Sequence, residues 1–63
     1  MNRIQPGDIV MITLRVMPRL GMVLEIYEKE KPLKDIARVH VLEHNKAYNF
    51  HVIDLEKINH KNI

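Results

Sequence analysis

The sequence has neither cysteine nor serine among its 63 residues. Without cysteine, the chain forms no disulfide and offers no thiolate to a zinc ion. Thr13 is then the only one of the usual hydroxyl or thiol nucleophiles. The carboxylates available for acid–base catalysis are scattered along the chain, at Asp8, Glu25, Asp35 and Asp54. We therefore expect no enzymatic activity and no cofactor.

Glycines, aromatic residues and long apolar runs are also scarce. Two glycines do not make a phosphate-binding loop. Three aromatic residues are too few for a platform on which several bases stack. No stretch approaches the roughly 20 apolar residues of a membrane span, and residues 1–6 lack the apolar run of a signal peptide. We expect a cytoplasmic protein that does not bind a membrane.

Hydrophobic residues nevertheless make up 46% of the chain, which is normal for a folded domain. Many of them are Val and Ile, which favour strands. The longest run of strand-forming residues is 20–27, Leu-Gly-Met-Val-Leu-Glu-Ile-Tyr. We predict that it is the long, bent central strand of a small β-barrel. The length allows one domain, so residues 1–63 form a single unit with frayed tails at 1–5 and 59–63.

Five short strands are predicted, at residues 9–13, 21–28, 36–42, 48–52 and 56–58. A turn at Pro6-Gly7-Asp8 precedes the first strand, because Pro fixes φ and Gly accepts a positive φ. Residues 14–19 form a loop, since Pro18 is poorly tolerated inside a sheet. Residues 28–35 form a charged, solvated loop, and residues 43–46 form a tight turn. Residues 53–55 are expected to make one 3-10 turn that Asp54 caps.

The core is predicted from the alternation of apolar residues along the strands. Its members on the first and third strands are Val10, Ile12, Ala37, Val39 and Val41. On the second strand, Val23 and Ile26 are three residues apart and would face opposite sides of a regular strand. A bulge or sharp bend near residues 24–25 is needed for both side chains to enter the core. Residues 36–52 form the clearest hairpin.

Two pieces of the sequence resemble the opening of KOW-type barrels, which occur in ribosomal proteins and transcription elongation factors. They are residues 6–12, Pro-Gly-Asp-Ile-Val-Met-Ile, and residues 21–26, Gly-Met-Val-Leu-Glu-Ile. Residues 54–58 are similar to the end of SH3-like domains. The resemblance implies an all-β fold, a five-stranded SH3-like barrel with a short 3-10 turn before the last strand, and it implies RNA binding. The chain also looks like small uncharacterised barrels of bacteriophages and environmental sequences, a resemblance that implies no activity.

The first loop sets apolar residues beside basic ones. We expect a non-catalytic binding module that acts by protein–protein contact, with a partner protein or a second copy of the chain in a homodimer. The residues predicted to make this contact are Leu14, Arg15, Val16, Met17 and Arg19. The alternative is that the apolar side chains tuck under the loop as a satellite core.

Basic residues in the loops after the first and second strands suggest a second function, nucleic-acid binding. The two loops flank one surface in an SH3-like barrel, and contacts to phosphate would come from Arg15, Arg19, Lys29, Lys31, Lys34 and Arg38. Acidic residues in the second loop offset this charge, and the chain carries a formal net charge of only +2. A solvated surface is the simpler interpretation of the same residues.

The chain has four histidines, His40, His44, His51 and His60. On the predicted hairpin, His40 and His51 share the face away from the core and could approach each other, with Glu43 as a further ligand. A zinc site needs three or four protein ligands. We therefore predict solvated histidines and no metal site.

Overall fold

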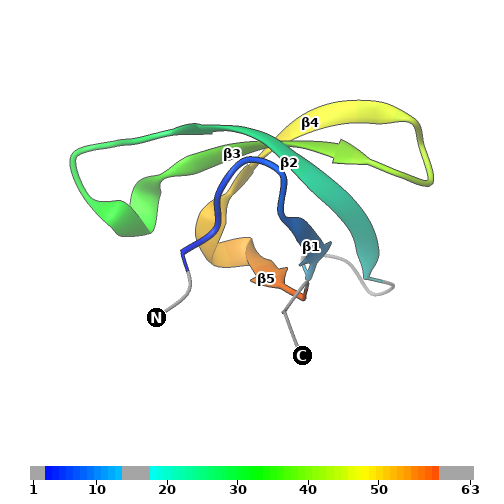
Figure 1. The fold of residues 1–63 in the computed structure, drawn as a ribbon. Coiled ribbons are helices and arrows are strands. Elements are labelled where there is room, and N and C mark those ends of the chain that lie inside the picture. The colour runs from blue at the N-terminus through cyan, green and yellow to red at the C-terminus, as the bar shows by residue number, and fades with distance from the viewer. Residues whose placement is uncertain (1–2, 14–17, 59–63) are drawn as a thin grey trace.

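The computed structural model describes residues 3–13 and 18–58. These residues form strands β1 (Ile9–Ile12), β2 (Arg19–Tyr27), β3 (Ile36–Val41), β4 (Lys46–His51) and β5 (Leu55–Lys57), with 3-10 turns η1 (Pro32–Lys34) and η2 (Val52–Asp54). The strands pair antiparallel in the order β4-β3-β2-β1-β5 (Figure 1). The predicted all-β domain, with five antiparallel strands and a 3-10 turn before the last, is confirmed. The described segments contain no helix long and apolar enough to cross a membrane.

Strand β2 is the middle strand of this sheet, and it curves along its length (Figure 1). Its pairing with β3 shifts register between Val23 and Glu25, which marks a bulge. Val23 is 1% exposed, and Ile26 packs partly buried against the same core. The bend predicted near residues 24–25 is therefore confirmed, because the extra residue turns Ile26 back to the inner face.

The core lies on the inner face of the sheet, where small and β-branched side chains alternate with outward-facing ones. Its buried members are Val10, Ile12, Val23, Ala37, Val39, Val41 and Leu55. Gly21 also faces inward and pairs with Val10 and Val41 on either side. A Cβ on Gly21 would lie 2.4 Å from Val39 Cγ1 and 2.9 Å from the His40 carbonyl oxygen. The interior of β2 therefore has room only for glycine at this position.

The turn before β1 has the predicted chemistry. Gly7 has a φ of 95°, which glycine adopts readily, and its N–H donates to the Val23 carbonyl at 2.8 Å. The Asp8 carboxylate accepts from the Gln5 N–H at 2.8 Å. Ile4 packs against the core ahead of this turn. The turn thus fixes the segment before β1 to the middle of β2.

One end of the β3–β4 hairpin is closed by the chain itself, and we call it the sealed end. Turn η2 follows β4 there, and the Val52 N–H donates to the Asp35 carbonyl at 3.0 Å. The Asp35 side chain is 7% exposed and accepts the Lys29 N–H at 2.8 Å, which ties the charged loop to the same place. Thr13 donates from both its N–H and its hydroxyl to the Asp54 carbonyl.

Two local predictions at these turns were wrong. Turn η2 begins at Val52, so Asp54 is its last residue, and the residue before the turn, His51, makes no side-chain capping bond. Asp54 therefore anchors β1 through its backbone carbonyl and caps nothing. Strand β4 begins at Lys46, earlier than predicted, because Asn45 adopts a φ of 55° and lets Lys46 pair with Val41.

Candidate functional site

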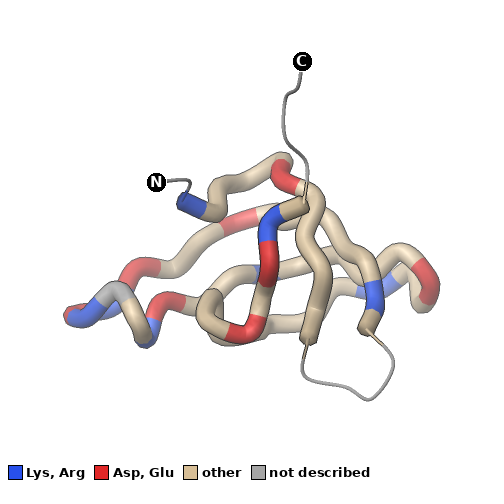
Figure 2. Tube along the Cα trace, turned by 90° about the horizontal axis from the view of Figure 1, so that it is seen from below, with Lys and Arg blue, Asp and Glu red and all other residues tan. Residues whose placement is uncertain are grey.

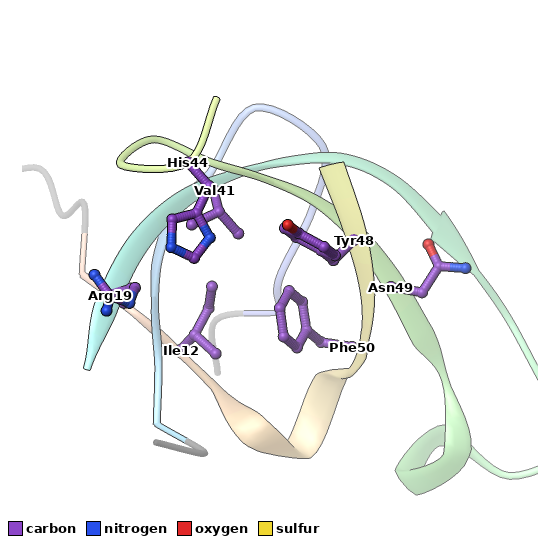
Figure 3. Close-up of a pocket in the computed structure, with 7 residues that line it drawn as sticks. All are labelled: Ile12, Arg19, Val41, His44, Tyr48, Asn49 and Phe50. Carbon is purple, nitrogen blue, oxygen red and sulfur yellow. The ribbon is translucent and has the colours of Figure 1, made fainter. Parts of the chain in front are cut away.

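A pocket of about 210 Å³ lies at the opposite end of the hairpin from η2, beside the turn that joins β3 to β4. We call this the open end. The pocket draws on every strand except β5, and the residues that line it are Ile12, Arg19, Val41, His44, Tyr48, Asn49 and Phe50 (Figure 3). Ile12 and Val41 are core residues, 2% and 3% exposed. The pocket is therefore a place where the interior of the sheet can be reached from solvent.

Two aromatic rings of β4 form one wall of the pocket. Tyr48 and Phe50 pair with Val39 and Ala37 of β3, so all four side chains belong to the inner face. Phe50 packs partly buried against the core, whereas Tyr48 is 41% exposed. The Tyr48 ring contacts the Phe50 ring edge-on at a centroid distance of 6.4 Å, and the His44 ring at 6.2 Å. These two ring contacts fix the position of the Tyr48 side chain at the edge of the pocket, although no described residue covers its exposed side.

The polar rim of the pocket centres on Arg19, the first residue of β2. Its Nη1 donates to Glu43 Oε1 across the open end, in an ion pair between residues far apart in sequence. Its Nε is buried and has no hydrogen-bond partner among the described residues. A buried donor without an acceptor costs about 1–3 kcal/mol. Arg19 therefore lines a largely apolar pocket with its Nη1 held by Glu43 and its Nε enclosed by neighbouring atoms.

A second, shallower hollow adjoins the first on the other side of Arg19. Its volume is about 420 Å³, and its lining residues are Pro18, Arg19, Leu20, Leu42 and Glu43. Leu20 and Leu42 are 41% and 49% exposed, and the Leu42 N–H donates to the Leu20 carbonyl. Arg19 thus lines both hollows, and its ion-pair partner Glu43 lines the second.

Of the residues predicted to bind a partner, Arg19 lies in both hollows. Leu14, Arg15, Val16 and Met17 lie outside the described residues. They connect Thr13 to Pro18 in the chain, so the segment leaves and re-enters the described structure next to the pocket residues Ile12 and Arg19.

The residues predicted to bind nucleic acid are not brought together. Arg19 begins β2, whereas Lys29, Lys31 and Lys34 follow its other end, with nine strand residues between the two loops. Figure 2 shows the charged loop at one extreme of the molecule and the β3–β4 turn at the other, with basic and acidic positions interleaved in the loop. Arg38 lies on the outer face of β3 and donates to Asn49 Oδ1 at 3.3 Å.

The histidines expected to approach each other on the hairpin are kept apart by its register. His51 pairs with Ile36, whereas His40 pairs with Ala47, so the two lie roughly 13 Å apart along the hairpin. That expectation was wrong, because the turn after β3 occupies residues 42–45, one residue earlier than predicted, and this shifts the pairing of β4 with β3. Within residues 3–13 and 18–58, no group of three His, Asp or Glu side chains is placed to hold a metal ion.

Sequence reasoning did not identify Tyr48, Phe50 and His44 as site residues. The alternation in β4 predicted that Tyr48 and Phe50 share a face, but no sequence pattern says which of the two the chain leaves uncovered. Comparison of the chain with protein-family models, with curated proteins and with solved structures found no match in any of the three.

Proposed function

We propose that this chain is a non-catalytic binding module, built as an SH3-like barrel, that contacts a partner protein through the pocket at its open end. The strand order and the 3-10 turn before β5 support the barrel, because a four-stranded meander whose fifth strand follows that turn and pairs with the first is the layout of such domains. The binding role is supported by the pocket itself.

The observation that carries the proposal is the exposure of Tyr48. An inward-facing aromatic residue of a small sheet is expected to be covered, because its burial contributes to a marginal core. Here Tyr48 is 41% exposed beside a pocket that reaches Ile12 and Val41. Aromatic residues in such pockets are the usual anchors of protein–protein contacts.

The test is a selection of linear peptides from a random library on the immobilised protein. Peptides retained by the wild type should lose binding to Tyr48→Ala and to His44→Ala, which remove two rings from the pocket. They should keep binding to Tyr27→Ala, because Tyr27 is similarly exposed at 38% but lies on the outer face. Peptides that bind all four proteins equally, or no selected peptide at all, would contradict the proposal.

Nucleic-acid binding stays a prediction of the sequence. The interleaved acidic residues and the separation of the basic residues along β2 do not favour it. If it is the function, affinity for single- or double-stranded oligonucleotides should fall steeply with salt and should fall again in Lys31→Ala. Salt-sensitive binding of this kind, without any selected peptide, would replace the proposal above.

A further inference from the structure

The pocket borders a strand whose outer edge is open. Strand β4 ends the sheet order, and β3 is its one partner among the described strands. Alternate residues of such an edge strand direct their backbone N–H and C=O groups away from the sheet. The open edge is therefore a row of hydrogen-bonding groups that an extended chain can use.

The pocket also reaches the backbone of β4. Three consecutive residues, Tyr48, Asn49 and Phe50, line it, yet neighbouring side chains of a strand point to opposite faces. The Asn49 side chain accepts a hydrogen bond from Arg38 on the outer face, and Figure 3 shows it on the far side of the strand from the two rings. Asn49 must then meet the pocket through its backbone, so pocket and strand edge form one surface.

The rim of this surface favours an acceptor from the ligand. Arg19 lies at this rim with its Nη1 held by Glu43, and its side chain is 29% exposed. Lys46 adds a second positive charge at the same end of β4, and Glu43 is the acidic residue of the turn. A carboxylate bound to an arginine gains about twice what a neutral acceptor gains.

We propose that the occupant of the pocket is an extended acidic segment of a partner protein that adds to the open edge of β4. One of its apolar side chains fills the space between Tyr48 and Phe50 and the core residues below them. A neighbouring aspartate or glutamate accepts a hydrogen bond from the exposed part of the Arg19 guanidinium, beside Lys46. Strand addition supplies affinity through the backbone, and the pocket supplies the choice of side chain. This inference rests on the proposed function and names the chemistry of the partner.

The first experiment uses the peptides that bind the wild type and not Tyr48→Ala. They are expected to share an apolar residue next to an acidic one. Each is then resynthesised with N-methyl groups on alternate backbone nitrogens, in both registers. A paired strand turns every second N–H toward its neighbour. One register should therefore weaken binding by about tenfold or more, and the other should leave it unchanged.

The second experiment addresses Arg19. Arg19→Lys keeps the positive charge opposite Glu43 but loses the planar guanidinium that can donate to Glu43 and to a ligand carboxylate together. Peptide affinity should fall about tenfold, the size of one hydrogen bond to a charged group. Arg38→Lys is the matched control, because Arg38 donates to Asn49 on the outer face. The affinity of this variant for the peptides should equal that of the wild type.

The outcomes separate the two proposals. Peptides that need Tyr48 but tolerate N-methylation in both registers would overturn strand addition and leave the binding module standing. Peptides that need Tyr48 but lack acidic residues, with Arg19→Lys binding as well as wild type, would overturn the acidic partner. A dimer that dissociates in Tyr48→Ala, with no peptide selected, would identify a second copy as the occupant.

Discussion

The two ends of the β3–β4 hairpin both have aromatic side chains on the inner face of the sheet, but the chain covers these side chains to different extents. Toward the sealed end, Phe50 lies on the part of the pocket wall next to η2 and packs against the core, and the Val52 N–H of η2 donates to the Asp35 carbonyl. At the open end, Tyr48 stands on the same face and the same strand but is 41% exposed over a pocket. A chain of 63 residues can cover one end with its own turns. The difference suggests that stability is concentrated at the sealed end and recognition at the open end.

The largest expected effect comes from the core beneath the middle strand, β2. Gly21→Ala should lower the free energy of unfolding by about 3 kcal/mol, because overpacked cores lose roughly 1–3 kcal/mol and the new Cβ would meet both Val39 and the His40 backbone. A domain of this length has on the order of 3–9 kcal/mol in total, so the variant should be close to unfolding. Chemical denaturation measures the loss. Leu20→Ala, on the outer face next to it, is the control, and an equal loss there would contradict a packing cause.

Two variants on β4 test whether the side chain nearer the sealed end contributes more to stability than the side chain at the open end. Phe50→Ala should cost about 2 kcal/mol, less than a fully buried phenylalanine because Phe50 is only partly buried. Tyr48→Ala should cost about 1 kcal/mol, the value of its two edge-on ring contacts. Thermal unfolding followed by circular dichroism resolves this difference, which amounts to about 4–8 °C in Tm for a small domain. Equal losses would mean that the open end contributes as much to stability as the sealed end.

A smaller effect is expected from the loop that the sealed end holds. Asp35→Ala removes the acceptor of the Lys29 N–H and should lower the free energy of unfolding by about 1 kcal/mol, the net value of one hydrogen bond. Asp35→Asn keeps an acceptor oxygen and should lose less. Hydrogen exchange should show faster exchange of the Lys29 amide in the alanine variant, with the open-end amides unchanged. Faster exchange at both ends would show that the ends are not independent.

Local patterns in the sequence were enough to predict much of the core. Alternation placed Val10, Ile12 and the inner face of β3, and the three-residue spacing of Val23 and Ile26 required the bulge that the pairing shows. These features depend on neighbours in sequence and on the period of a strand, so they can be derived without knowing which strands pair.

The open end depends on residues distant in sequence, and sequence reasoning missed most of it. The pocket exists because β4 lies across from β1 with nothing described between them, and Arg19 is held by Glu43, a pair 24 positions apart. The separation of His40 from His51 follows from the hairpin register, which Asn45 sets. The length of β2 puts the two basic loops at opposite ends. Each of these features depends on strand register or strand length, so an error of one or two residues in a predicted strand boundary changes the prediction.

The smallest expected effect is a change in the pKa of one side chain, Tyr27, which lies on the outer face away from both ends. The Tyr27 hydroxyl donates to Glu25 Oε1 at 2.6 Å, and this hydrogen bond raises the pKa of Tyr27 above its ordinary value, with smaller contributions from burial and from the charge of Glu25. Because the folded state holds this proton more tightly than the unfolded state, the bond stabilises the fold below about pH 10, and its contribution is lost as pH rises through the raised pKa.

Glu25→Gln should lower the pKa of Tyr27 toward its ordinary value, since a neutral amide neither accepts as strongly nor repels the phenolate. Tyrosinate absorbance measures the pKa in a Tyr48→Phe background, where Tyr27 is the one remaining tyrosine. An unchanged pKa would mean that Glu25 and Tyr27 are not bonded in solution. A change in the pKa of Tyr27 in His44→Ala would show that the outer face is coupled to the open end, which would contradict the independence of these two regions.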